Sequence, residues 1–157
     1  MSRNISKAML AMACFTLISM GFTLAARAQA CSLSQTAGKW GVSTNGTVVG
    51  IGPRQSVATF TLDAAGNVLH GKGTASLNGT VTDEIFSGTY TVNPDCTGTM
   101  TVEFFDASGN KTLAATGDLV FVQDMRELLL IYKTAVLPDG TALAPVIVVD
   151  GKRINEQ

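Results

Sequence analysis

The stretch "DEIFSGTYTVNPDCTGTMTVEFF", residues 83–105, decides the fold class of this chain. On both sides of "NPDC" (93–96) apolar residues alternate with polar ones, which is typical of strands that bury one face. Asn, Pro and Asp favour turns, so the stretch predicts an antiparallel hairpin. The predicted inner face consists of Phe86, Gly88, Tyr90 and Val92 before the turn and of Met100, Val102 and Phe104 after it.

The same alternation continues in the segments that precede this hairpin. It runs through "SVATFTL" (56–62) and "NVLHGKGTASL" (67–77). In the second segment we expect Leu69 and every second residue after it to face inward, which places His70 outside. Together with the later strand-like segments, the pattern predicts an antiparallel meander of about eight strands. The only helix expected after residue 30 is a single turn over "SLSQTAG" (32–38).

Three Asn-x-Thr triplets match the pattern of N-glycosylation sites, at Asn45, Asn78 and Asn110. Two of them begin with Asn-Gly, which is a favoured hairpin turn. We therefore interpret all three as turns, and we expect the first strand, from Trp40 to Thr44, to end at Asn45.

Eight strands in one open sheet would leave two unpaired edges, and closure into a barrel removes both. The prediction is an all-β fold, a single antiparallel up-and-down β-barrel. A β-sandwich is the alternative, although it usually needs long crossover connections that are absent here. A bacterial outer-membrane barrel would need a continuous apolar outer face, whereas one face of these strands carries Thr, Lys, Ser and His.

The first 30 residues have the pattern of a signal peptide that is removed on export. A short basic segment with Arg3 and Lys7 precedes an apolar run over 8–25, and "AQA" (28–30) fits a signal-peptidase site. Cleavage there leaves a domain of residues 31–157, periplasmic or secreted, with no stable membrane span. An uncleaved membrane anchor and a lipid attached to Cys31 are the alternatives.

The mature chain would keep two of the three cysteines, Cys31 and Cys96. Because an exported chain meets an oxidising compartment, this pair predicts a disulfide. Closing the loop from residue 31 to residue 96 would stabilise the fold by about 4 kcal/mol in chain-entropy models. With one histidine and no CxxC or HxxH spacing, the sequence predicts no metal site and no cofactor.

Charge argues against several classes of partner. Removing Arg3, Lys7 and Arg27 from the formal charge of −1 leaves −4 for residues 31–157. Nucleic acids and anionic membrane surfaces require clustered Lys and Arg, so neither is expected as a partner.

Glycines on the predicted inner face raise the question of a pocket. Gly71, Gly73 and Gly88 would leave space in the barrel, which large neighbours could fill or a small ligand could occupy. We take Tyr90, with Tyr132 as a second candidate, as the polar group of such a pocket. The complete set of expected pocket residues is Trp40, Phe60, Gly71, Gly73, Phe86, Gly88 and Tyr90.

The last three strand-like segments are apolar on both faces. They are "LVFVQ" (119–123), "LLLIY" (128–132) and "VIVV" (146–149). A strand that is apolar on both sides is either covered or meets a partner. We therefore expect these strands, the sixth to eighth predicted, to mediate formation of a homo-oligomer.

"AGKW" (37–40) resembles the Gly-x-Trp motif that opens the first strand of lipocalins and other calycins. In that family the Trp closes one end of an eight-stranded barrel, often beneath an arginine from the last strands, for which Arg126 and Arg153 are candidates. "GTYTVNPDCTGTMTV" (88–102) further resembles a stretch found in uncharacterised small exported bacterial proteins with lipocalin-like or allene-oxide-cyclase-like barrels. The resemblance implies a barrel and export, but no activity.

The sequence therefore predicts a small exported barrel that binds or carries a small apolar molecule in its interior. No catalytic residues are predicted, because the single His70 alternates with Lys72 and Thr74 on an exposed face. Two alternatives stay open: a structural or self-associating envelope protein with a filled core, and a cyclase or isomerase that shapes an apolar substrate.

Overall fold

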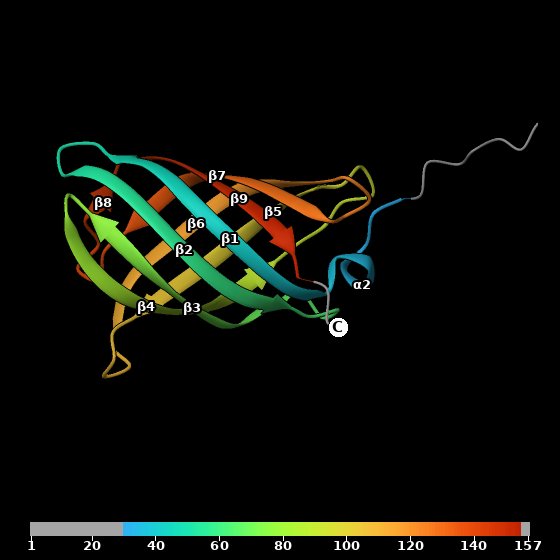
Figure 1. The fold of residues 1–157 in the computed structure, drawn as a ribbon, viewed down its shortest axis with the longest axis horizontal. Helices are drawn as coiled ribbons and strands as arrows, with labels where there is room; N and C mark the ends of the chain where they lie inside the picture. The colour runs from blue at the N-terminus through green and yellow to red at the C-terminus, as the bar shows by residue number, and fades with distance from the viewer. Residues whose placement is uncertain (1–29, 155–157) are drawn as a thin grey trace, which may run out of the picture.

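The computed structural model describes residues 30–154. The predicted signal segment, apart from Ala30, lies outside these residues. The described part is an all-β barrel preceded by one helical turn (Figure 1). The elements are α2 (Leu33–Thr36), β1 (Gly38–Val48), β2 (Gly52–Leu62), β3 (Asn67–Leu77), β4 (Thr80–Tyr90), β5 (Thr97–Phe105), β6 (Lys111–Val122), β7 (Glu127–Val136), β8 (Ala142–Leu143) and β9 (Pro145–Arg153).

Eight strands form a closed antiparallel ring. Consecutive strands pair from β1 to β7, β7 pairs with β9, and β9 returns to β1. The two-residue strand β8 pairs with the end of β7, on the same edge of β7 as β9. The predicted up-and-down barrel is confirmed, and closure excludes the sandwich alternative.

The predicted alternation places the core in the barrel interior. Phe86 and Tyr90 of β4 are buried, as are Met100, Val102 and Phe104 of β5. Phe86 makes aromatic contacts with Phe104 and with Phe60 on β2.

Two local predictions were wrong. β1 does not end at Asn45 but continues to Val48. Gly46 lies so close to β9 that a side chain at this position would overlap the Val146 carbonyl, so this glycine serves strand pairing rather than a turn. The turn comes later, at Gly50, whose φ of 81° favours glycine. Asn78 and Asn110 do lie at or beside turns.

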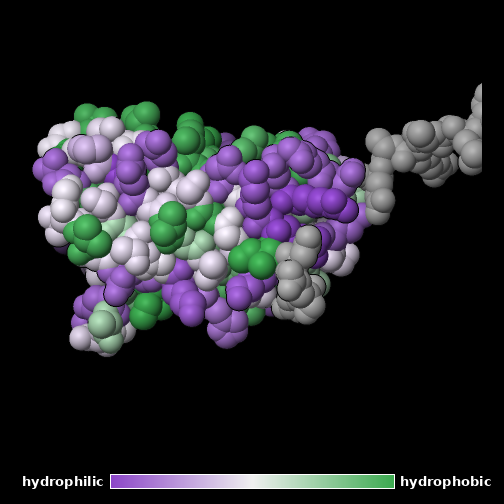
Figure 2. Space-filling view, in the orientation of Figure 1, coloured by the Kyte–Doolittle hydropathy of each residue, from purple (hydrophilic) through white to green (hydrophobic). Residues whose placement is uncertain are grey.

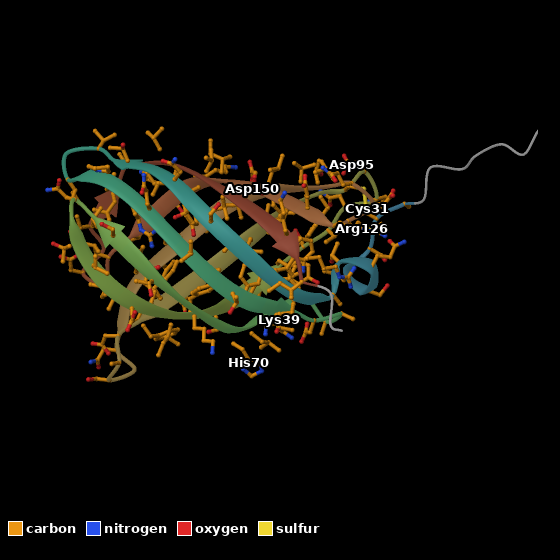
Figure 3. The ribbon with its side chains drawn as sticks, viewed as in Figure 1. Cys31, Lys39, His70, Asp95, Arg126 and Asp150 are labelled. Carbon is orange, nitrogen blue, oxygen red and sulfur yellow. A yellow bond between two sulfur atoms is a disulfide. The ribbon has the colours of Figure 1, made fainter. Side chains whose placement is uncertain are left out.

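The second error concerns β3, where Leu69 lies outside and Val68 is buried instead. A β-bulge between Val68 and Gly71 inserts an extra residue, and His70 there adopts a φ of 55°. The bulge shifts the phase of alternation, so Gly71 and every second residue after it face inward as predicted. His70 points away from the barrel (Figure 3).

The end of the barrel that carries α2 is closed; we call it the closed end. Trp40 is fully buried and donates its indole N–H to the Thr36 carbonyl of α2, at 3.1 Å. Arg153 lies opposite Trp40 in the β1–β9 register and donates to the carbonyls of Gln35 and Ala37. Of the two candidate arginines, Arg153 is thus the one that holds the helical turn onto the barrel.

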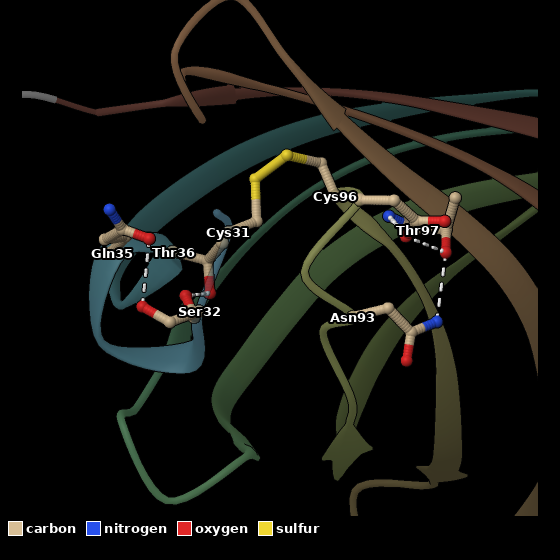
Figure 4. Close-up of a disulfide and its surroundings, with 8 residues drawn as sticks. Cys31, Ser32, Gln35, Thr36, Asn93, Cys96 and Thr97 are labelled. Atoms are coloured by element: carbon tan, nitrogen blue, oxygen red, sulfur yellow. Dashed lines mark hydrogen bonds between the residues drawn. A yellow bond between two sulfur atoms is a disulfide. The ribbon is translucent and has the colours of Figure 1, made fainter. Parts of the chain in front are cut away.

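The predicted disulfide joins Cys31 to Cys96 at this end (Figure 4). Their Cα atoms are 5.0 Å apart, within the normal range for a disulfide. The Cys31 N–H also donates to the Pro94 carbonyl at 3.1 Å. The bridge therefore ties the segment before α2 to the β4–β5 turn, and Cys96 has a structural role.

The outer surface facing the viewer in Figure 2 is carried by β1, β2 and β3, and its apolar side chains form separate spots among polar ones. No helix within residues 30–154 is long and apolar enough to span a membrane.

Candidate functional site

The opposite end of the barrel, which we call the open end, holds a depression of about 390 Å³. We name it the vestibule. Its volume is in the range of small-molecule sites in proteins. The apolar part of its wall comes from the ends of the strands and the loops that join them: Ala75, Leu77, Phe104, Phe105, Leu113, Leu137 and Leu143.

A buried ion pair lies where the vestibule meets the barrel interior. Arg54 of β2 donates from Nη2 to Oε1 of Glu84 on β4, at 2.5 Å. The two side chains are only 9% and 19% exposed, so both charges are largely removed from water. Arg54 Nη1 also donates to the Thr44 hydroxyl at 3.2 Å, and Thr44 shares a 2.7 Å hydrogen bond with Ser56.

Small residues on β3 allow this pair to form. β3 lies between β2 and β4, and Gly73 is in register with Ala58 on one side and with Glu84 on the other. Because Gly73 and Ala75 contribute little volume to the interior, the long Arg54 side chain can cross the inner face of β3 to reach Glu84. Gly73, one of the glycines that suggested a pocket, thus helps to make room for an ion pair.

Tyr132 of β7 is a further polar residue of the site. Burial raises the pKa of its hydroxyl to about 12, and the nearby charges of Arg54 and Glu84 act in opposite directions on it. No hydrogen bond to another described residue contributes to this shift. Since every fully enclosed side-chain nitrogen and oxygen of the described residues has a partner, the Tyr132 hydroxyl must border open space.

Two small cavities provide that space, and Tyr132, Arg54 and Phe104 line both. The inner cavity, of about 40 Å³, extends toward Phe60 and Phe86 in the middle of the barrel. The side cavity, of about 70 Å³, extends toward β9 and shares Leu77, Leu113 and Leu143 with the vestibule. Each can hold a few water-sized groups, and the side cavity adjoins the vestibule directly.

The residues expected to line a pocket fall into separate places. Phe60 and Phe86 line the inner cavity. Trp40 and Tyr90 belong to the closed end, where the Tyr90 hydroxyl lies 2.7 Å from the Asp63 carbonyl and 3.2 Å from the Thr36 hydroxyl. Burial raises the pKa of Tyr90 as well, but its hydroxyl has partners in the fold.

The three predicted pocket glycines lie against neighbouring atoms rather than beside empty space. A Cβ at Gly71 would overlap the Phe86 ring, and one at Gly73 would overlap Ala58 and the Val57 carbonyl. At Gly88 it would overlap the Thr101 carbonyl on β5.

Arg54, Glu84 and Tyr132 therefore form the centre of the candidate site, and the first two were missing from the predicted set. The alternation that placed Phe60 and Phe86 inside extends backward to Arg54 and Glu84 by steps of two. This alternation of inward and outward residues is the sequence pattern from which Arg54 and Glu84 could have been predicted to face inward. Tyr132 was predicted as the second candidate for the polar group of the pocket.

Among the described residues, the lining of the site contains carboxylates, one guanidinium and hydroxyls but no histidine or cysteine. His70 is outside the barrel, and both described cysteines are joined to each other. Within residues 30–154 no group of three or more His, Cys, Asp or Glu is arranged to hold a metal ion. What the arrangement offers is a hydrogen-bonding surface at the base of an apolar vestibule.

Comparison with solved structures shows a similar fold in the structure of EF1p2_mFAP2b bound to DFHBI. The two chains have 13% sequence identity and a TM-score of 0.54, and the match covers 78% of this chain and 100% of the other. At this identity the likeness concerns the fold alone. No family model matches the chain, and no curated protein does.

Proposed function

We propose that the protein binds a small, largely apolar molecule through the vestibule at the open end of its barrel. The observation that carries this proposal is an apolar-walled depression of about 390 Å³ with buried polar side chains at its base. Binding sites for small molecules typically combine mostly apolar walls with a few fixed polar groups. The similar barrel EF1p2_mFAP2b is bound to DFHBI, which supports the idea that such a barrel can accept a ligand.

The location differs from the central pocket that the sequence suggested. The middle of the barrel has only about 40 Å³ free, because the Phe86 ring lies against Gly71 and the aromatic contacts of Phe60 and Phe104 fill the core. A ligand of more than a few atoms would therefore remain near the open end.

Fluorescence of the neutral apolar dye Nile red, titrated with the protein, tests this proposal. Leu77→Trp should weaken binding, because Leu77 lines both the vestibule and the side cavity and the larger indole would occupy part of this space. Val57→Trp is the matched control, since Val57 lies on the outer face of β2 and is 64% exposed. Absence of binding by the unmodified protein, or equal loss in both variants, would overturn the proposal.

We further propose that the protein is exported and that residues 31–157 are the mature chain. The Cys31–Cys96 bridge supports an oxidising compartment. A Cys31 sulfur engaged in a disulfide is also not free to carry a thioether-linked lipid. Mass spectrometry of the protein from its native host should find an unlipidated chain beginning at Cys31, and a lipid adduct or an intact leader would contradict this.

Self-association is a second proposal, carried by the outer face of β7 and β9. Leu129, Ile131, Val146 and Val148 are 42–64% exposed, and Ile131 pairs directly with Val148. The Lys133–Asp118 and Lys152–Glu127 ion pairs lie on these strands and the adjoining one, and Asp150 lies beside Leu129, so charges of both signs flank the patch and are available to a second copy facing it.

Light scattering over a range of concentrations tests this second proposal. The unmodified protein should form dimers, and Ile131→Lys should return it to monomers. Val57→Lys, on the outer face of β2, should leave the dimer intact. A monomer at every concentration would exclude the proposal.

A further inference from the structure

We infer that the site selects ligands whose polar end is neutral, a hydroxyl or a carbonyl, and that it discriminates against carboxylates. The inference rests on the proposed function and specifies the ligand class for the same site. It follows from the arrangement of charge around the vestibule and from the free hydroxyl of Tyr132.

The charge of Arg54 is already balanced within the barrel. Its guanidinium donates to Glu84 and to Thr44, so the one cation that residues 30–154 place at the base of the vestibule has a carboxylate beside it. A ligand carboxylate approaching Arg54 would come close to Glu84 in a poorly hydrated place, where repulsion between like charges is strong.

The wall of the vestibule adds to this repulsion. Besides Glu84, the lining includes Asp106, whereas Arg54 is the only basic residue that the described part of the chain contributes to it, so these side chains give the lining a formal charge of −1. Asp83 also borders the vestibule, but its carboxylate accepts a hydrogen bond from Thr74 on the outer face of the barrel. Hydrogen bonds from the Asn110 side chain and backbone hold the pKa of Asp106 below its ordinary value, which keeps this carboxylate ionised at neutral pH. Lys111, next to the same loop, is paired with Glu103 at 2.6 Å and lies outside the lining.

Tyr132 supplies the group that a neutral ligand would need. Tyr132 lines the side cavity, which adjoins the vestibule, and its hydroxyl has no partner among the described residues. With a pKa near 12 it remains a phenol at physiological pH and can donate a hydrogen bond or accept one. An extended ligand with its apolar body in the vestibule would place its polar end beside this hydroxyl.

The test compares 1-octanol with octanoate at pH 7.5 as competitors of bound Nile red. The two ligands have the same chain length and differ in the charge of the polar end. We expect 1-octanol to bind at least about tenfold more tightly than octanoate. Equal or tighter binding of octanoate would overturn the inference while leaving the proposed function intact. If neither the dye nor either ligand binds, both fail.

Glu84→Gln sharpens the test, because it removes the neutralising charge and leaves Arg54 available to an anion. Octanoate should then gain about tenfold or more in affinity relative to 1-octanol. Glu103→Gln is the matched control: it removes an equal charge from the outer face of β5 and should leave the ratio unchanged. An unchanged ratio in Glu84→Gln would overturn the inference.

Should Glu84→Gln fail to fold, Tyr132→Phe provides an independent test. Loss of one hydrogen bond should weaken 1-octanol by roughly fivefold. Tyr90→Phe, which removes the corresponding hydroxyl from the closed end, should not alter 1-octanol binding. Undiminished affinity for 1-octanol in Tyr132→Phe would overturn the placement of the polar end.

Discussion

The two ends of the barrel use the same residue types in opposite ways. At the closed end, Arg153 and Tyr90 donate to backbone carbonyls of α2 and of the β2–β3 turn. At the open end, Arg54 bonds only to side chains, and the Tyr132 hydroxyl has no partner among the described residues. Polar groups at the first end hold chain segments together, whereas those at the second border cavities.

This difference separates stability from function within one small domain. Loss of a closed-end partner leaves backbone carbonyls buried without a donor, which costs free energy of unfolding. Loss of the Tyr132 hydroxyl leaves no protein group unsatisfied. We therefore expect changes at the closed end to alter stability and loss of the Tyr132 hydroxyl to alter binding. Loss of Glu84 would also lower stability, because it leaves the buried Arg54 charge without its partner.

The largest expected effect is on the closed end. Trp40 is fully buried, contacts Phe121 at a ring-centroid distance of 5.6 Å, and binds α2 through its indole N–H. Trp40→Ala should lower the free energy of unfolding by about 3–5 kcal/mol, because it leaves a large cavity. Urea denaturation followed by circular dichroism would measure this. A loss below 1 kcal/mol, about that of a surface change, would refute the assigned role of Trp40.

Removal of the disulfide should have the next largest effect on the free energy of unfolding. Replacing Cys31 and Cys96 together with Ala should cost about 2–5 kcal/mol of unfolding free energy, as expected for a bridge in a small secreted domain. Thiol titration of the unmodified, non-reduced protein should find neither cysteine free. Because the bridge lies at the closed end, Nile red binding should persist under conditions where the variant remains folded. Loss of binding in the folded variant would show that the two ends are coupled.

Much of the closed end and of the barrel could be predicted from sequence because those features leave local patterns. The NPDC turn, the helical turn at α2 and the Cys31–Cys96 pair each depend on a few neighbouring residues or on a count of two. The phase error at Leu69 arose because a bulge adds one residue without any composition signal of its own.

The open-end site was harder to predict because it depends on contacts between distant strands. Arg54 and Glu84 are 30 positions apart, and they meet across β3, which carries the small residues Gly73 and Ala75 between them. The alternation of inward and outward residues along β2 and β4 is enough to place both side chains inside the barrel. Whether they meet depends on how β2, β3 and β4 are aligned. That alignment is set in part by the bulge in β3 and by the position of the turn after β1, neither of which was predicted.

Alkaline pH should reveal the buried Tyr132. Its folded pKa of about 12 exceeds the ordinary value of 10, so the unfolded state loses this proton first as pH rises. The stabilisation from Tyr132 is therefore complete below about pH 10 and is lost as pH rises toward 12. Over that range the unmodified protein should lose about 2–3 kcal/mol more unfolding free energy than Tyr132→Phe. Parallel alkaline denaturation curves for the two proteins would contradict the burial of this hydroxyl.

The smallest expected effect compares the two tyrosines at neutral pH. Tyr90→Phe removes the hydroxyl that lies 2.7 Å from the Asp63 carbonyl, and it should lower the free energy of unfolding by about 1–2 kcal/mol. Tyr132→Phe removes no hydrogen bond to a described residue and should change it by less than about 0.5 kcal/mol. Thermal denaturation of both variants, each beside the unmodified protein, measures the difference. Equal losses would mean that Tyr132 is held by the fold as Tyr90 is, and the two ends would then no longer differ in how they use their polar groups.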